Sequence, residues 1–232
     1  MKKTEHNNLF FRIAKATYNT VLDTLFPKCC IMCGRLLPAN CEFCVCHRCK
    51  PEMKNQSHVI VDNNCGCEEI ISPFTYDGNV RQAMLKFKFK GIEYIGYTFA
   101  KAIADMLYGR RFVEEDCVLV SVPIHISRDR DYNQSDVIAR QVSELTGLPY
   151  HSDVVYKIKP ISRISGMLRR DKKFFVQGSF HFNSCYNLTG KTVIIVDDIY
   201  TSGSTLKVFA DELKMHGAHK VYALTACVTE AQ

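Results

Sequence analysis

Apolar residues follow different patterns in successive parts of the chain. In residues 1–27 they recur at spacings of three and four, which predicts an amphipathic helix that ends at Pro27. Residues 28–69 show neither helical spacing nor alternation, and they contain nine of the 12 cysteines. From residue 70 onward, short apolar runs alternate with segments of helical spacing. The pattern therefore divides the chain into an N-terminal helix (1–27), a cysteine-rich module (28–69) and a larger domain (70–232).

The larger domain alternates predicted strands and helices. Buried strands are predicted over residues 70–74, 117–122, 192–196 and 220–228, and helices over 80–87, 94–108, 137–145 and 205–215. Strands that alternate with helices indicate a mostly parallel sheet flanked by helices. The expected fold class is therefore α/β with a small N-terminal module.

The composition is that of a globular protein. Of the 232 residues 47% are hydrophobic, with 14 Phe and 11 Tyr, which excludes a chain that is disordered throughout. No stretch approaches the roughly 18–20 uncharged apolar residues of a membrane span. His6, Arg12 and Lys15 interrupt the region where a signal peptide needs an apolar core, so we expect a cytoplasmic protein. The net charge of +6 permits nucleic-acid or phosphate partners without requiring them.

Two adjacent carboxylates follow the apolar run 193–196. Asp197 and Asp198 are expected at the carboxyl end of this strand, where open α/β sheets bind ligands. The small residues 201–205 come next and lead into a helix, so that backbone N–H groups and hydroxyls can converge on an anion. Together these features predict a sugar-phosphate site. The alternative, a capped helix without a ligand, would need only one such polar residue.

The stretch 193–205 resembles the 5-phosphoribosyl 1-pyrophosphate (PRPP) motif of type I phosphoribosyltransferases, which implies their fold. The resemblance implies that Asp197 and Asp198 bind the ribose 2′- and 3′-hydroxyls and are the catalytic residues of an active enzyme. It also implies that the 5′-phosphate is bound by Thr201, Ser202, Gly203, Ser204 and Thr205. Tyr200 stands where most of these proteins have a small aliphatic residue.

Further motifs resemble those of the ComF family. Phe74-Thr-Tyr-Asp-Gly78 and Leu85-Lys-Phe-Lys-Phe-Lys-Gly91 look like the start of that family's transferase-like domain. Its VPxH…R…RGFNQ block is matched by Val122-Pro-Ile-His125, Arg128, Arg130 and Asn133-Gln-Ser135. A cysteine-rich metal module before this domain is also typical of the family. The chain after Pro27 is therefore identified as similar to the ComF family over nearly its whole length.

Basic residues follow the strand that Pro123 ends. This strand is expected to end at the same sheet edge as Asp197, so His125, Arg128 and Arg130 can face the pyrophosphate side of PRPP. Guanidinium groups make bidentate phosphate contacts, which makes both arginines PRPP-binding candidates. The alternative is a set of solvated charges beside neighbouring aspartates.

Departures from the family pattern bear on turnover of PRPP. Asp131 stands where the family has Gly. In the segment that would be the flexible loop over PRPP, Ile164, Lys172 and Phe175 take the places of Gln, Arg and Asn. The fold is not affected, but whether the protein is an enzyme stays open.

Two Cys-x-x-Cys pairs separated by twelve residues predict a metal site. A closed, structural Cys₄ zinc site would consist of Cys30, Cys33, Cys46 and Cys49. The spacing is slightly shorter than the range of about 15–20 residues that is usual for such pairs. Cys29, Cys41 and Cys44 compete for the register, and a second metal at Cys65 and Cys67 is left open. Free thiols or an iron–sulfur cluster are the alternatives.

Lysines alternate with phenylalanines in residues 86–90, and residues 169–173 form a second basic cluster. Lysines and aromatic rings can neutralise and stack on single-stranded DNA. The commoner alternative is a helix or strand edge that buries its apolar side and leaves its lysines in solvent.

The resemblance implies a PRPP-binding protein that acts in DNA uptake and processing during natural transformation. Its partners would be single-stranded DNA and a ComFA-like helicase. The alternative is an active phosphoribosyltransferase, which transfers phosphoribosyl from PRPP to a nucleobase or related acceptor and releases pyrophosphate, with Mg²⁺ bound to PRPP. A protein that only senses PRPP is a third class. No segment can be assigned to nucleobase recognition, which favours the DNA role.

Overall fold

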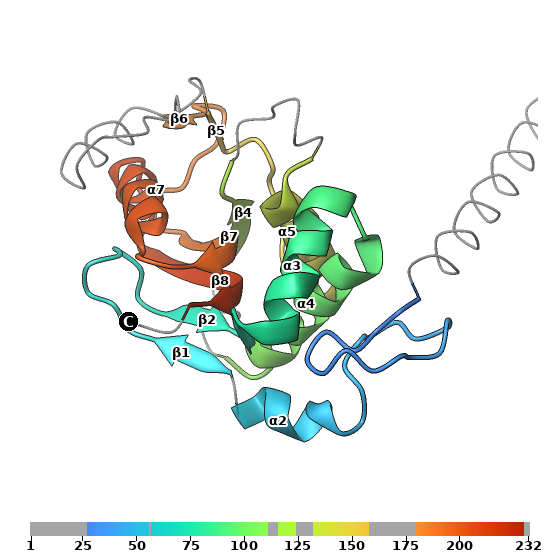
Figure 1. The fold of residues 1–232 in the computed structure, drawn as a ribbon. Coiled ribbons are helices and arrows are strands. Elements are labelled where there is room, and N and C mark those ends of the chain that lie inside the picture. Colours follow the sequence, from blue (N-terminus) through green and yellow to red (C-terminus); the bar gives the residue numbers. More distant parts are fainter. Residues whose placement is uncertain (1–26, 56, 111–115, 124–131, 158–179, 230–232) are drawn as a thin grey trace, which may run out of the picture.

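The computed structural model describes residues 27–55, 57–110, 116–123, 132–157 and 180–229. They form a main sheet with helices on both faces and a separate two-stranded sheet (Figure 1). The helix predicted over residues 1–27 lies outside the described residues except for Pro27. None of the helices described here combines the length and the apolar character needed to cross a bilayer.

The main sheet has six strands and is mostly parallel. The strands are β1 (His58–Ile60), β2 (Ile70–Ser72), β3 (Phe74–Thr75), β4 (Cys117–Ser121), β7 (Thr192–Tyr200) and β8 (Lys220–Val228). They run in the order β1-β2-β8-β7-β4, with β3 also paired to β8, and every pairing except that of β1 with β2 is parallel. The predicted α/β class with a mostly parallel sheet is confirmed.

Helices cover the two faces of the sheet unequally (Figure 1). On one face lie α3 (Gly78–Lys90), α4 (Glu93–Leu107) and α5 (Gln134–Thr146), and on the other lies α7 (Ser204–Met215). Successive residues of a strand point to opposite faces. Ile194 and Val196 therefore belong to the core under α4 and α5, whereas Val193 and Ile195 belong to the core under α7.

The cysteine-rich module joins the larger of these cores. Its buried residues Cys30, Ile31 and Val45 belong to the same apolar cluster as residues of α3 and α4. The backbone N–H of Cys44 donates to Oγ1 of Thr98 (3.1 Å) on α4. The side-chain amide of Asn79 on α3 donates to the carbonyl of Met32 (3.1 Å). The module is thus packed against the helices rather than standing apart from them.

The structure contains several short helices and strands that the sequence pattern does not predict. Residues 28–69 contain α2 (Cys49–Asn55) and β1, although their sequence shows no periodicity. A second small sheet pairs β5 (Val155–Lys157) with β6 (Phe180–Phe182). Each of these strands has three residues, which is too short for alternation to be recognised in a sequence.

Candidate functional site

The carboxyl ends of β4 and β7 meet at one edge of the sheet. Ser121 is the register partner of Val196, and the backbone N–H of Val122 donates to the carbonyl of Val196 (3.0 Å). The shared edge of these two strands is as predicted. The sequence pattern predicts that the strand from residue 192 ends at Val196, and this is wrong. Strand β7 continues to Tyr200, because β8 is equally long and pairs with it over this length. Asp197 and Asp198 are therefore held in regular strand geometry.

Asp197 accepts two hydrogen bonds from neutral groups. The Ser135 hydroxyl at the start of α5 donates to its Oδ1 (3.0 Å), and the backbone N–H of Asp198 donates to the same oxygen (2.8 Å). These bonds do not offset the loss of water around the carboxyl. Burial, together with the neighbouring charge of Asp198, raises the pKa of Asp197 from 3.8 to about 7.

Asp198 is paired with a cation. Nζ of Lys88 on α3 lies 2.6 Å from Oδ2 of Asp198, and only 14% and 15% of the two side chains are exposed. The lysine–phenylalanine alternation noted in the sequence therefore lies on a helix. Each residue of a helix turns its side chain by about 100°, so two residues that are two positions apart point to nearly opposite sides. Phe87 is accordingly buried, whereas Phe89 is 63% exposed. Lys88 reaches the acidic pair instead of solvent.

Residues 132–135 join three elements around the acidic pair. Tyr132 and Gln134 donate to the carbonyls of Phe87 and Lys88, at the C-terminal end of α3. The Asn133 amide donates to the carbonyl of Val122 (3.0 Å), and its oxygen accepts from the N–H of Ser135 (3.0 Å) and so caps α5. This block was noticed in the sequence only as a resemblance. Its contacts hold Lys88 and Ser135 beside the two carboxylates, a role that the sequence pattern did not reveal.

The loop 201–205 leads directly from β7 into α7. Gly203 has φ +69°, in the left-handed region that favours glycine, and it is the residue before the first turn of α7. Within the described residues, no side-chain hydrogen bond caps this helix N-terminus. Thr201, Ser202, Ser204 and Thr205 are exposed, and the hydroxyls of Ser202 and Ser204 are 2.9 Å apart. The arrangement leaves N–H groups and hydroxyls available to an anion.

Several predicted site residues lie outside the part of the chain that the structure describes. They are His125, Arg128, Arg130 and the segments 164–175 and 169–173. Their placement stays a prediction.

Four cysteines of the module come together as the sequence spacing suggested. The Sγ atoms of Cys30, Cys33, Cys46 and Cys49 all lie within 4.8 Å of one another. The sulfurs of Cys33 and Cys46 are 3.7 Å apart, close to the roughly 3.8 Å that tetrahedral geometry with Zn–S bonds of about 2.3 Å requires. Cys33 is exposed and the other three are buried. The donor set and its spacing can hold a metal ion.

The electrostatics of this cluster favour a thiolate. Burial raises the pKa of Cys46, but the backbone N–H groups of Cys49 and Arg48 and the thiols of the cluster outweigh it and lower the pKa to about 6. Burial and the neighbouring thiols raise the pKa of Cys49. Because a cation would favour the charged form of every thiol, its binding would release protons from the remaining cysteines.

The competing cysteines have other partners. The thiol of Cys29 donates to the carbonyl of Pro27 (3.2 Å), and that of Cys41 donates to the carbonyl of Phe43 (3.1 Å). Cys65 and Cys67 belong to the core under α7. Among the described residues, only the cluster of Cys30, Cys33, Cys46 and Cys49 brings at least three potential ligands within reach of one ion.

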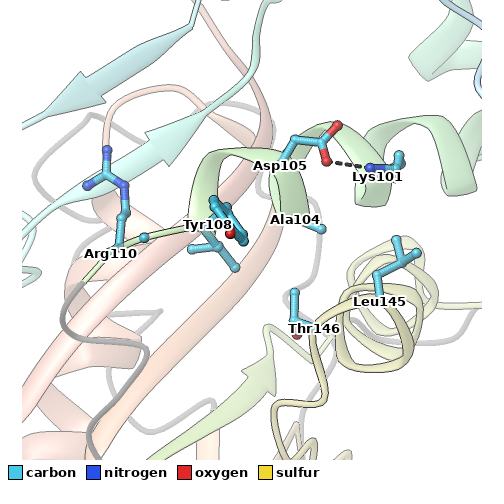
Figure 2. Close-up of a pocket in the computed structure, with 9 residues that line it drawn as sticks. Lys101, Ala104, Asp105, Tyr108, Arg110, Leu145 and Thr146 are labelled. Atoms are coloured by element: carbon cyan, nitrogen blue, oxygen red, sulfur yellow. Dashed lines mark hydrogen bonds and ion pairs between the residues drawn. The ribbon is translucent and has the colours of Figure 1, made fainter.

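A surface pocket of about 410 Å³ lies between the C-terminal ends of α4 and α5 (Figure 2). Its charged groups are already paired, Lys101 with Asp105 and Arg110 with Glu69. Ser135 is near the start of α5 and Thr146 is its last residue, so at 1.5 Å per residue this end lies about 16 Å from Ser135. The predicted PRPP-binding residues that the structure describes do not line this pocket, so we do not place the candidate site there.

Comparisons with known proteins give a family match over the domain that carries the acidic pair. The family model described as "Phosphoribosyl transferase domain" matches residues 87–231. "Competence protein F" of Haemophilus influenzae is 25% identical over 143 residues, which cover 59% of this chain and 62% of that protein.

Two further relatives have names of the same kind. "Competence protein ComFC" of Bacillus subtilis is 26% identical and covers 58% of this chain and 53% of its own length. "DNA utilization protein YhgH" of Escherichia coli K12 is 28% identical, with 48% and 49% covered. The chain thus spans between about half and three fifths of the length of these relatives. Their names confirm the resemblance to the ComF family.

Proposed function

The chain belongs to the family of phosphoribosyl transferase domains, and from this premise we propose that it is a ComF-type protein that binds PRPP and acts in DNA uptake and processing during natural transformation. The observation that carries the proposal is the pair Asp197 and Asp198 at the carboxyl edge of the parallel sheet, followed at once by an uncapped helix N-terminus. The names of the relatives, which refer to competence and to DNA utilization, support the cellular role.

The acidic pair suits the ribose hydroxyls of a ribose phosphate, and the loop that follows it suits the phosphate. Carboxylates accept hydrogen bonds from vicinal hydroxyls, so Asp197 and Asp198 would hold the ribose. The loop from Thr201 to Thr205 would hold the 5′-phosphate with N–H groups and hydroxyls. Arg128 and Arg130 would contact the pyrophosphate. In an active enzyme the same two aspartates would be the catalytic residues.

Magnesium fits this site through its donor set. Mg²⁺ prefers oxygen ligands and is usually held by one or two carboxylates together with substrate phosphates. The carboxylates of Asp197 and Asp198 lie where PRPP would bring its phosphates. When bound, the ion would neutralise the charge that develops on the pyrophosphate.

We assign zinc to the cysteine cluster. Four thiolates in a closed, mostly buried arrangement are the donor set of structural zinc sites, so Cys30, Cys33, Cys46 and Cys49 would hold one ion. The expected partners are single-stranded DNA and a ComFA-like helicase, and the expected location is the cytoplasm.

Calorimetry with PRPP and Mg²⁺ tests the ligand assignment. The double variant Asp197→Asn/Asp198→Asn keeps the size of both side chains but removes the charges that accept from ribose hydroxyls. Two lost charge-assisted hydrogen bonds, each about 1.5–3 kcal/mol, predict an affinity loss of roughly 100-fold or more. Asp105→Asn, which alters the distant pocket instead, is the control and is expected to bind normally. Unchanged affinity in the double variant would refute the assignment.

An active phosphoribosyltransferase is the second candidate, because the acidic pair and the loop are both complete. A pyrophosphate-release assay with a panel of nucleobases separates the two functions. Binding of PRPP without release supports the competence role, and release with one base moves the protein to the enzyme class.

A further inference from the structure

A segment of the cysteine-rich region lies beneath the candidate phosphate loop. It runs from Val61 to Cys67, and its two cysteines are buried in the core under α7. A methyl group at Gly203 would lie 3.2 Å from the ring of Tyr200 and 3.3 Å from Cβ of Cys65. The backbone at Gly203 is therefore enclosed between Tyr200 and this segment, which also reaches the middle of α7, because Gly66 faces Ala210 and Asp211.

A side-chain hydrogen bond ties the end of β7, where the loop begins, to the segment. The hydroxyl of Tyr200 donates to Oδ2 of Asp62 (2.7 Å), across 138 residues of sequence. The other carboxylate oxygen of Asp62 accepts from the backbone N–H of Asn64 (2.9 Å), which fixes the orientation of the acceptor. The Tyr200 side chain is only 9% exposed, so its ring cannot turn freely.

The charge states of both partners suit this bond at neutral pH. The hydrogen bond from Tyr200 and that from Asn64 lower the pKa of Asp62, so its carboxylate stays charged. Burial and the hydrogen bond to Asp62 raise the pKa of Tyr200, so the phenol keeps its proton. The bond is thus one from a neutral donor to a charged acceptor, which is the stronger kind.

We propose that Asp62 and Tyr200 are positioning residues that hold the loop 201–205 in the geometry that binds the 5′-phosphate. Tyr200 is the last residue of β7, so its position sets where the loop begins. The bond to Asp62 and the ring contact at Gly203 then fix the first three loop residues against the segment from Val61 to Cys67. The inference rests on the proposed function, because it presumes that this loop binds a phosphate. Neither residue is assigned a contact with the ligand.

Ligands with and without a 5′-phosphate distinguish positioning from general stabilisation. Tyr200→Phe removes only the hydroxyl and keeps the ring against Gly203. We expect its affinity for PRPP and for ribose 5-phosphate to fall about tenfold, as for one charge-assisted hydrogen bond, measured by calorimetry with Mg²⁺. The affinity for magnesium pyrophosphate, which has no 5′-phosphate, is expected to stay within twofold of wild type.

A second variant tests whether the two residues act together. Asp62→Ala is expected to lose the same factor as Tyr200→Phe, and the double variant is expected to lose no more than either alone, since all three lack the same bond. Tyr186→Phe is the matched control, because Tyr186 also donates to an aspartate, Asp153, but in a different part of the chain. Its ligand affinities are expected to equal those of wild type.

The outcomes separate this inference from the proposed function. If wild-type protein binds neither PRPP nor ribose 5-phosphate, the proposed function fails and the positioning role fails with it. If wild type binds PRPP and Tyr200→Phe binds it within twofold as tightly, the positioning role alone is overturned. An equal loss for PRPP and for pyrophosphate, with a lowered melting temperature, also overturns it, because a general structural role would then suffice.

Discussion

The two carboxylates of the candidate site have unequal surroundings. Asp198 is paired with the ammonium of Lys88, whereas the donors to Asp197 in the described part of the chain are neutral, the Ser135 hydroxyl and the N–H of Asp198. Burial and the charge of Asp198 consequently raise the pKa of Asp197 to about 7. Near neutral pH the free site therefore exchanges a proton, and a ligand that needs both carboxylates charged must bind with release of that proton.

The raised pKa of Asp197 predicts how folding stability depends on pH. A carboxyl with a higher pKa in the folded state holds more protons there, so the stability it supports is complete below pH 3.8 and is lost as the pH rises towards 7. Asp197→Asn cannot ionise and should escape this loss. We expect the melting temperature of this variant to be several degrees above that of wild type at pH 8, because each kcal/mol of stability shifts it by about 2–4 °C. At pH 4 the two melting temperatures are expected to be nearly equal. Thermal denaturation at both pH values measures this, and a difference independent of pH would contradict it.

At the scale of elements, α3 brings Lys88 to the sheet edge because it packs closely on α4. Gly96 of α4 lies against the ring of Phe87, where a methyl group would come within 2.8 Å of the ring carbons. The close approach, rather than an unusual backbone angle, explains the glycine. The carbonyls at the end of α3 are held in turn by Tyr132 and Gln134.

A methyl group added at this contact should force α3 away from α4. Overpacking of a core typically costs about 1–3 kcal/mol, so Gly96→Ala is expected to lower the free energy of unfolding by that amount. It should also weaken PRPP binding, because Lys88 moves with α3. Chemical denaturation and calorimetry measure the two effects. Adding Phe87→Leu, which removes ring atoms at the contact, should restore part of the stability, and no recovery would show that the steric explanation is wrong.

At the scale of the whole molecule, the cysteine-rich region touches the phosphoribosyl transferase domain on two sides. Residues around its cysteine pairs bond to Asn79 on α3 and Thr98 on α4, and Asp62 in its later segment bonds to Tyr200, beside the candidate phosphate loop. The module that contains the cysteine cluster is therefore packed against α3, the helix that carries Lys88, rather than forming an independent unit.

Loss of a metal ligand should lower the stability of the whole protein as well as its zinc content. Cys30→Ser removes one of four ligands, so we expect the purified variant to contain much less than one equivalent of zinc and to melt well below wild type. Cys185→Ser, a change at an exposed cysteine outside the cluster, should keep both properties. Metal analysis and thermal denaturation measure them. A full equivalent of zinc in Cys30→Ser would refute this choice of ligands.

Features that depend on neighbouring residues could be predicted from the sequence. The four apolar residues before Asp197 determine a buried strand, and the strands β4 and β8 and the helix α7 follow from local periodicity within one or two residues. Each Cys-x-x-Cys pair aims its own two thiols to one side, which follows from a tight turn, whereas the choice of Cys30, Cys33, Cys46 and Cys49 over the competing cysteines is seen in the folded chain.

Features that depend on distant residues were decided only by the tertiary structure. The extension of β7 to Tyr200 requires β8 as its partner, and the ion pair of Lys88 with Asp198 joins residues 110 positions apart. The bond between Asp62 and Tyr200 likewise joins residues 138 positions apart. Periodicity indicates which face of an element is buried but not which element covers it, so only the tertiary structure gives the partners of the acidic pair and of the candidate phosphate loop.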